Sequence, residues 1–400
     1  MIEIDFIIVF VLLFVINRML LNSIAKKHAF FDKSLMNKLY WYHFVFLIIY
    51  FLYGLSNNTD SYHYYYVSST LGDTWIEKFA TGTIFINCLA APFVQLGLSY
   101  VSLMMIFSWM GYVGFVYAYL YFRESIPINV KVFGRFDLLT LLLFLPNMHF
   151  WTASLGKGSV IFMGLMIFSY AVKFPQKRII TLIVGGFFIY MVRPHVMLFV
   201  LVGVMIGLLT GKGKVSIGVK ILVLVASVGF LVVASSSILA VAKIEDSENL
   251  TDAVDGFDDF ASASSARLQT SGSGVDMSNY PMPVKLFTLW FRPLFVDSPG
   301  MIGQFSSLEN FIYLLLFLKI INKRFLGFIK KAPYMVKMSA IIFLLSSIAL
   351  TFIMSNLGIM MRQKSMVMYF GFFVIYYFLA MEQWKIQKAN ENKRAQAISN

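Results

Sequence analysis

Apolar segments long enough to cross a lipid bilayer recur along almost the entire chain, and short clusters of lysine and arginine separate them. A helix needs roughly 20 apolar residues to cross the hydrocarbon layer. On this rule the predicted spans are 5–23, 40–56, 100–122, 137–152, 159–174, 179–192, 196–210, 219–241, 308–322, 336–354 and 363–381. Only 13% of the residues are charged, whereas about a quarter are charged in a soluble domain. The sequence therefore predicts an all-α polytopic integral membrane protein, with residues 1–400 as one membrane domain of about 11 transmembrane helices, in a range of roughly 10 to 12.

The positions of the basic clusters predict how the chain crosses the membrane, because cytoplasmic loops are enriched in lysine and arginine. The clusters lie in 24–39, 123–135, 173–178, 211–220, 323–332 and the tail after Met381. They fall on one side if segment 81–98, which Pro92 and Gly97 interrupt, is an interfacial or re-entrant helix on the outer surface. This arrangement predicts an external amino terminus, a first external loop at 57–99, a large external loop at 243–307 and a cytoplasmic tail at 382–400.

Basic residues on the predicted outer side depart from this pattern and are candidates for substrate binding. They are Lys157, Arg193, Arg267, Arg292 and Arg362, with Lys364 close behind. A cation near the membrane is costly and is often functional, although a single one can also extend to lipid headgroups. The planar fork of arginine donates paired hydrogen bonds to phosphate oxygens. Together these residues predict a cavity that binds a diphosphate, capped by the large external loop.

Two residues on the same side are candidates for acid–base catalysis. Asp60 follows the second predicted span and can act as a general base towards a sugar hydroxyl, and His195 follows the Arg193–Pro194 pair and has an ordinary pKa near neutrality. An aromatic interface belt and a structural histidine are the alternative interpretations of these two segments. Sugar contacts are predicted for nearby aromatic and polar residues, namely His63, Tyr64, Trp75, His149, Trp151 and Glu309. No histidines stand at metal-ligand spacing in the sequence, so neither a metal nor another cofactor is expected.

The order of these segments resembles a known family. An acidic and aromatic element runs from Asp60 to Tyr64, the stretch LPNMHFWTASLGKG closes one span, and Arg193–Pro194 follows a short span. The large loop then leads to the segments FRPLF and SLEN. Together they resemble the bacterial polysaccharide and O-antigen polymerases of the Wzy and EpsG-like type, which are similar to membrane glycosyltransferases of the GT-C fold.

The resemblance implies a multi-pass enzyme of the bacterial cytoplasmic membrane that polymerises lipid-linked oligosaccharide repeat units at the outer face. Its implied partners are an undecaprenyl-diphosphate-linked oligosaccharide, membrane lipid, a chain-length regulator and a flippase, with no nucleic acid. Arg193 and Arg292 correspond to the outer arginines of the family, with Arg267 and Arg362 as further contacts. Two other functions remain open: a GT-C-type glycosyltransferase that uses a lipid-phosphate sugar donor, and a non-enzymatic transporter of lipid-linked saccharides. The absence of a visible sequence repeat favours an enzyme over a transporter.

Overall fold

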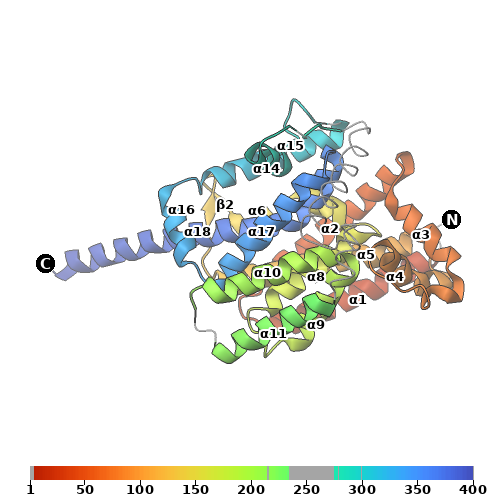
Figure 1. Cartoon of the computed structure of the whole chain (residues 1–400), viewed down its shortest axis with the longest axis horizontal. Helices are drawn as coiled ribbons and strands as arrows, with labels where there is room; N and C mark the ends of the chain where they lie inside the picture. Colours follow the sequence, from red (N-terminus) through yellow and green to blue (C-terminus); the bar gives the residue numbers. More distant parts are fainter. Residues whose placement is uncertain (1–3, 214–215, 234–273, 278, 299, 400) are drawn as a thin grey trace, which may run out of the picture.

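The computed structural model describes residues 4–213, 216–233, 274–277, 279–298 and 300–399, and these residues are mostly helical (Figure 1). The α-helices are α1 (Ile4–Lys27), α2 (Lys33–Ser56), α3 (Asp60–Thr70), α4 (Thr83–Gln95), α5 (Tyr100–Ser125), α6 (Leu138–Leu143), α7 (Pro146–Thr152), α8 (Lys157–Ala171), α9 (Ile179–Val192), α10 (Pro194–Thr210), α11 (Ile217–Val233), α14 (Met282–Phe291), α15 (Gly300–Leu318), α16 (Lys323–Lys331), α17 (Tyr334–Ile353) and α18 (Leu357–Ser399). Among the described residues, β1 (Lys131–Val132) and β2 (Phe136–Asp137) pair as a short antiparallel hairpin.

The apolar helices identify the chain as a membrane-embedded helical protein. Helices α1, α2, α5, α17 and the Met366–Arg394 part of α18 are long and apolar enough to cross a membrane. Shorter apolar helices accompany them, including α4, α8, α9 and α10. Large apolar side chains lie on the outside of the bundle, such as Met19 (67% exposed) and Ile180 (76% exposed), where lipid can cover them. The number of crossings, the orientation and the particular membrane remain predictions.

Helix α5 forms the centre of the bundle. Most of its side chains are buried, and it packs against α8, α1, α2 and α7. Gly111 permits the close approach of α7, because a Cβ atom at this position would lie 2.2 Å from the carbonyl oxygen of Thr152. Helix α17 packs against both α10 and α18, and α18 in turn contacts α7 and α8.

The predicted span 137–152 is helical at both ends but is interrupted in the middle. Helix α6 ends at Leu143 and α7 begins at Pro146, while Leu145 between them has an extended backbone (φ −66°, ψ 124°). A proline disfavours the helical conformation in the preceding residue and supplies no N–H to the helix before it. The break gives α7 an amino terminus of its own inside the bundle.

The predicted loops are partly helical. Segment 57–99 contains α3, a 3₁₀ helix η1 (Gly72–Trp75) and α4, and α3 packs against α4. Within 243–307, residues 243–273 lie outside the described part of the chain, and the rest contains α14 and the beginning of α15. Helix α18 continues without interruption into the predicted tail 382–400 and projects from the bundle (Figure 1).

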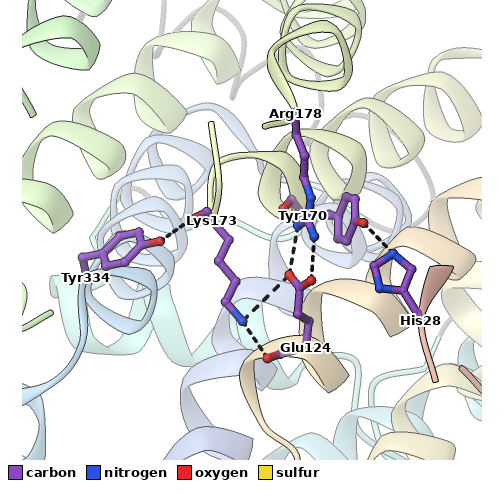
Figure 2. Close-up of polar contacts among 6 residues, drawn as sticks. All are labelled: His28, Glu124, Tyr170, Lys173, Arg178 and Tyr334. Carbon is purple, nitrogen blue, oxygen red and sulfur yellow. Dashed lines mark hydrogen bonds and ion pairs between the residues drawn. The ribbon is translucent and has the colours of Figure 1, made fainter. Parts of the chain in front are cut away.

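A polar cluster, here named the Glu124 cluster, joins several segments at the carboxyl end of α5; it consists of His28, Glu124, Tyr170, Lys173, Arg178 and Tyr334 (Figure 2). Arg178 donates hydrogen bonds of 2.6 and 2.9 Å to the two carboxylate oxygens of Glu124. The same guanidinium lies 3.8 Å from the ring centroid of Tyr170, whose hydroxyl is 2.9 Å from His28 Nε2. Tyr334 donates to the carbonyl of Lys173 at 2.8 Å. The cluster therefore connects α5, the α8–α9 turn, the α1–α2 turn and α17.

Candidate substrate cavity

A polar cavity of about 500 Å³ lies at the amino-terminal end of α5, opposite the Glu124 cluster. Ser61 in its wall accepts a hydrogen bond of 3.0 Å from Tyr100, the first residue of α5. A helix rises 1.5 Å per residue, and α8 runs from Lys157 in the cavity wall to Tyr170 of the Glu124 cluster, so about 20 Å separate the two polar sites. The wall contains several of the residues predicted from the sequence, namely Asp60, His63, Tyr64, Trp151, Lys157, Arg193 and Arg362.

Cations outnumber carboxylates in this cavity. Lys157, Arg193 and Arg362 all line it, and Asp60 is the carboxylate among its lining residues. Arg362 Nη1 lies 2.6 Å from Asp60 Oδ2, and the two side chains remain 36% and 58% exposed. Lys157 is close enough to Arg193, Arg362 and Asp60 to interact with their charges. An anion that enters the cavity therefore meets a net positive charge.

Arg193 is held between two helices. Its backbone N–H donates to Ile189 at 2.8 Å and closes α9, and Pro194 then begins α10. A proline is well accommodated at the first helical position and disfavours helix in the residue before it, which explains the extended backbone of Arg193 (φ −151°, ψ 87°). The buried Nε of Arg193 has no hydrogen-bond partner among the described residues. Burial and the charge of Arg362 lower the pKa of Arg193 to about 10, so the guanidinium remains protonated at neutral pH.

The aromatic wall is fixed by Asn147, a residue that the sequence did not indicate. Asn147 accepts a hydrogen bond of 3.0 Å from the indole N–H of Trp151 and donates one of 3.0 Å to the carbonyl of Met361. Its backbone N–H donates to Glu309 Oε2 at 2.7 Å. The Trp151 ring in turn lies 5.9 Å from the guanidinium carbon of Arg362. Asn147 thus holds both the Trp151 indole and the Met361 backbone beside Arg362. In the sequence, Pro146 was the only signal for this position.

Glu309 and Arg292 have structural contacts away from the cavity wall. The Glu309 carboxylate is buried, and besides the amide of Asn147 it accepts a hydrogen bond from the hydroxyl of Tyr313. Arg292 forms an ion pair with Asp297 five residues later. The buried ammonium of Lys364 donates to the carbonyl of Arg292 at 2.9 Å. Neither Glu309 nor Arg292 lines the cavity.

The remaining predicted residues are dispersed. His149 is fully buried, is stacked on Phe115 at 3.9 Å between ring centroids and lies 2.8 Å from His43, so its predicted sugar contact is not supported. Trp75 is half-buried, and its carbonyl accepts a hydrogen bond from Cys88. His195 does not line the cavity, and its buried Nδ1 has no partner among the described residues. Arg267 lies outside the described part of the chain.

Within the described ranges, no group of three or more histidine, cysteine, aspartate and glutamate residues is arranged to hold a metal ion. The cavity can instead act through charge and shape. Its cations can neutralise phosphate oxygens, Asp60 can accept a proton or bind hydroxyls, and the faces of Trp151 and Tyr64 can pack against the apolar faces of sugar rings.

No family model, curated protein or solved structure matches this chain.

Proposed function

We propose that the protein polymerises undecaprenyl-diphosphate-linked oligosaccharide repeat units by transferring a glycan block at the outer face of the bacterial cytoplasmic membrane. The observation that carries this proposal is the gathering of Lys157, Arg193 and Arg362 around the carboxylate of Asp60 in one cavity. Two fixed arginines and a lysine suit a ligand with more than one negative charge, such as a diphosphate. The cavity also has room for the sugars that flank the reacting bond, because ligand pockets of this size class hold molecules of several rings.

The reaction requires a leaving group and a base. A hydroxyl of the acceptor sugar attacks the anomeric carbon of the donor glycan, and the bond from that carbon to the diphosphate oxygen breaks. The electron pair of this bond moves to the diphosphate, where the cations stabilise the developing charge. The hydroxyl proton passes to Asp60, which lines the cavity, so we assign the base to Asp60 in preference to His195.

The Asp60–Arg362 ion pair gives Arg362 two roles. In the absence of substrate it holds the carboxylate at 2.6 Å. When a diphosphate binds, its oxygens compete for the same guanidinium, and the carboxylate becomes able to accept a proton. An ion pair as exposed as this one contributes only about 1 kcal/mol or less, so a doubly charged ligand can separate the two groups.

The test uses the purified chain in detergent with a defined undecaprenyl-diphosphate repeat unit and no nucleotide sugar, and products are followed on a gel. We expect a ladder of longer glycans from the wild type, and none from Arg193→Gln or Asp60→Asn. Arg394→Gln is the matched control, because this arginine is exposed on the projecting part of α18 and does not line the cavity. A ladder that persists in both cavity variants would refute the proposal.

The presence of Asp60 in the wall also supports the second candidate, a glycosyltransferase that takes one sugar from a lipid monophosphate. A single-sugar addition from such a donor, without a ladder, would favour it. If neither substrate gives a covalent product, the cations are better interpreted as part of a transport path for lipid-linked saccharides.

A further inference from the structure

Helix α16 lies at the same end of the bundle as the Glu124 cluster, between α15 and α17 (Figure 1). Tyr334, three residues after α16, bonds to Lys173 of that cluster. The side chain of Asn322 caps the helix by accepting a hydrogen bond of 3.0 Å from Phe325 N. Phe325 and Phe328 lie against Phe378 of α18, with ring centroids 5.3 and 5.4 Å apart. One face of α16 is thereby anchored to the bundle.

The rest of α16 is exposed and strongly basic. Its cations are Lys323, Arg324, Lys330 and Lys331, and all four are exposed. Among the described residues, Glu382 forms an ion pair with this set of cations: it lies 3.4 Å from Arg324 and is shared with Lys385. One carboxylate cannot neutralise four cations, so α16 presents a net positive surface.

Exposed apolar residues accompany these charges. Ile321, just before the helix, is 74% exposed, and Leu326 within it is 65% exposed. A helix that combines exposed leucine with cations lies at the boundary between lipid tails and headgroups, with the apolar side chains among the acyl chains.

We propose that α16 is a binding site for the anionic headgroups of phospholipids in the leaflet at this end of the protein. The charge of the surface is complementary to a phosphate headgroup, and its exposed isoleucine and leucine reach acyl chains that a soluble acidic partner would not offer. The site lies at the opposite end of the bundle from the substrate cavity, and it does not depend on the function proposed for that cavity.

The experiment titrates the purified full chain in neutral detergent with fluorescently labelled phosphatidylglycerol in mixed micelles and measures the anisotropy of the lipid. The reference lipid is labelled phosphatidylcholine, and inorganic phosphate is added as a competitor. The test variant replaces the four cations of α16 with glutamine: K323Q, R324Q, K330Q and K331Q. The matched control removes four cations from the projecting part of α18: K385Q, K388Q, K393Q and R394Q.

A surface cation contributes about 1 kcal/mol to the binding of an anionic lipid surface, which corresponds to about fivefold in affinity. We therefore expect the α16 variant to bind phosphatidylglycerol at least tenfold more weakly, while the control variant changes by less than about threefold. Phosphatidylcholine should bind weakly to all three proteins, and millimolar inorganic phosphate should not displace the lipid. Raising the salt should weaken binding of the wild type, because the charges are exposed.

A further variant, K323R with K330R and K331R, keeps the charge and should keep the affinity. It separates loss of charge from loss of folding, which circular dichroism and gel filtration also check. Equal weakening in the α16 and α18 variants would overturn the proposal, because binding would then depend on overall charge alone. Unchanged binding in a folded α16 variant, or displacement by inorganic phosphate, would overturn it as well.

Discussion

Replacement of Glu124 by glutamine tests how much the Glu124 cluster contributes to the stability of the folded protein. In the wild type the carboxylate receives two hydrogen bonds from Arg178, at 2.6 and 2.9 Å, and lies 3.8 Å from the ammonium of Lys173 (Figure 2). Glutamine has nearly the same shape but no charge. Its amide NH₂ group would also place a donor opposite the donors of the guanidinium.

The expected loss of unfolding free energy follows from the burial of the three charged side chains. The side chains of Glu124, Arg178 and Lys173 are only 13%, 15% and 21% exposed. Removing one partner of a fully buried ion pair costs about 3–5 kcal/mol, because the other charge is left without compensation. Arg178 would keep its hydrogen bond to the carbonyl of Tyr170 at 2.9 Å and its stacking on that ring. We therefore expect Glu124→Gln to lower the free energy of unfolding by about 2–3 kcal/mol.

The assay is equilibrium unfolding in mixed micelles with a denaturing detergent, followed by tryptophan fluorescence. Asp60→Asn is the matched control, since it also converts a paired carboxylate into an amide. Its ion pair with Arg362 is as short, at 2.6 Å, but the side chains are 58% and 36% exposed. The expected loss of unfolding free energy for this control is below about 1 kcal/mol.

A loss of less than about 1 kcal/mol for Glu124→Gln, or a loss equal to that of Asp60→Asn, would refute the reasoning. Arg178→Lys provides an intermediate case. It keeps the charge but loses the paired geometry and the ring contact, so its effect should lie between zero and that of Glu124→Gln.

Three further outcomes are expected. Gly111→Ala should lower the unfolding free energy by about 1–3 kcal/mol in the same assay, because its Cβ would meet the Thr152 carbonyl at 2.2 Å. Gly229→Ala has nothing within 4 Å in helix α11 and should instead raise the unfolding free energy by up to about 1 kcal/mol. Burial lowers the pKa of His28 below its usual value of 6.5. The contribution of His28 to the free energy of unfolding is therefore complete above pH 6.5 and is lost as the pH falls through the lowered pKa. His28→Asn should flatten this part of the curve of stability against pH. Asn147→Ala should weaken binding of the lipid-linked substrate, measured as a raised KM, because the indole and the backbone beside the cavity arginine both lose a hydrogen bond.

Much of the helical architecture follows from the sequence. Most predicted spans coincide with a helix within a few residues, as at 100–122 for α5 and 179–192 for α9. Other helices run well beyond the predicted spans, such as α18 beyond 363–381 and α15, which begins before 308. In 137–152 Pro146 divides the segment, and proline chemistry could have predicted that break. The helical prediction works because lipid offers no hydrogen-bond partners to the backbone. The N–H and C=O groups of an apolar segment must therefore bond to one another, which a helix allows.

The candidate site was predictable only as a set of possibilities. The sequence favoured Arg193 and Arg292 over Lys157 and Arg362 as phosphate ligands, whereas the structure brings Arg193, Lys157 and Arg362 together in the cavity and leaves Arg292 outside its wall. Arg292 has its own acidic partner five residues later, a local pair that the sequence did not identify. Asn147 could not be found because its importance comes largely from its contacts with Glu309 of α15 and Met361 of α18, which are distant in the sequence.

The sequence by itself determined that this is a helical membrane protein. An apolar segment lies in lipid, and there its backbone N–H and C=O groups must form hydrogen bonds within the segment, as a helix does. The tertiary structure alone decided which polar side chains share a cavity. Asp60 and Arg362 are 302 residues apart in the chain and 2.6 Å apart in space. Such a pairing depends on how whole helices pack, and helix packing is set by the shapes of many side chains together, which no local pattern of residues records.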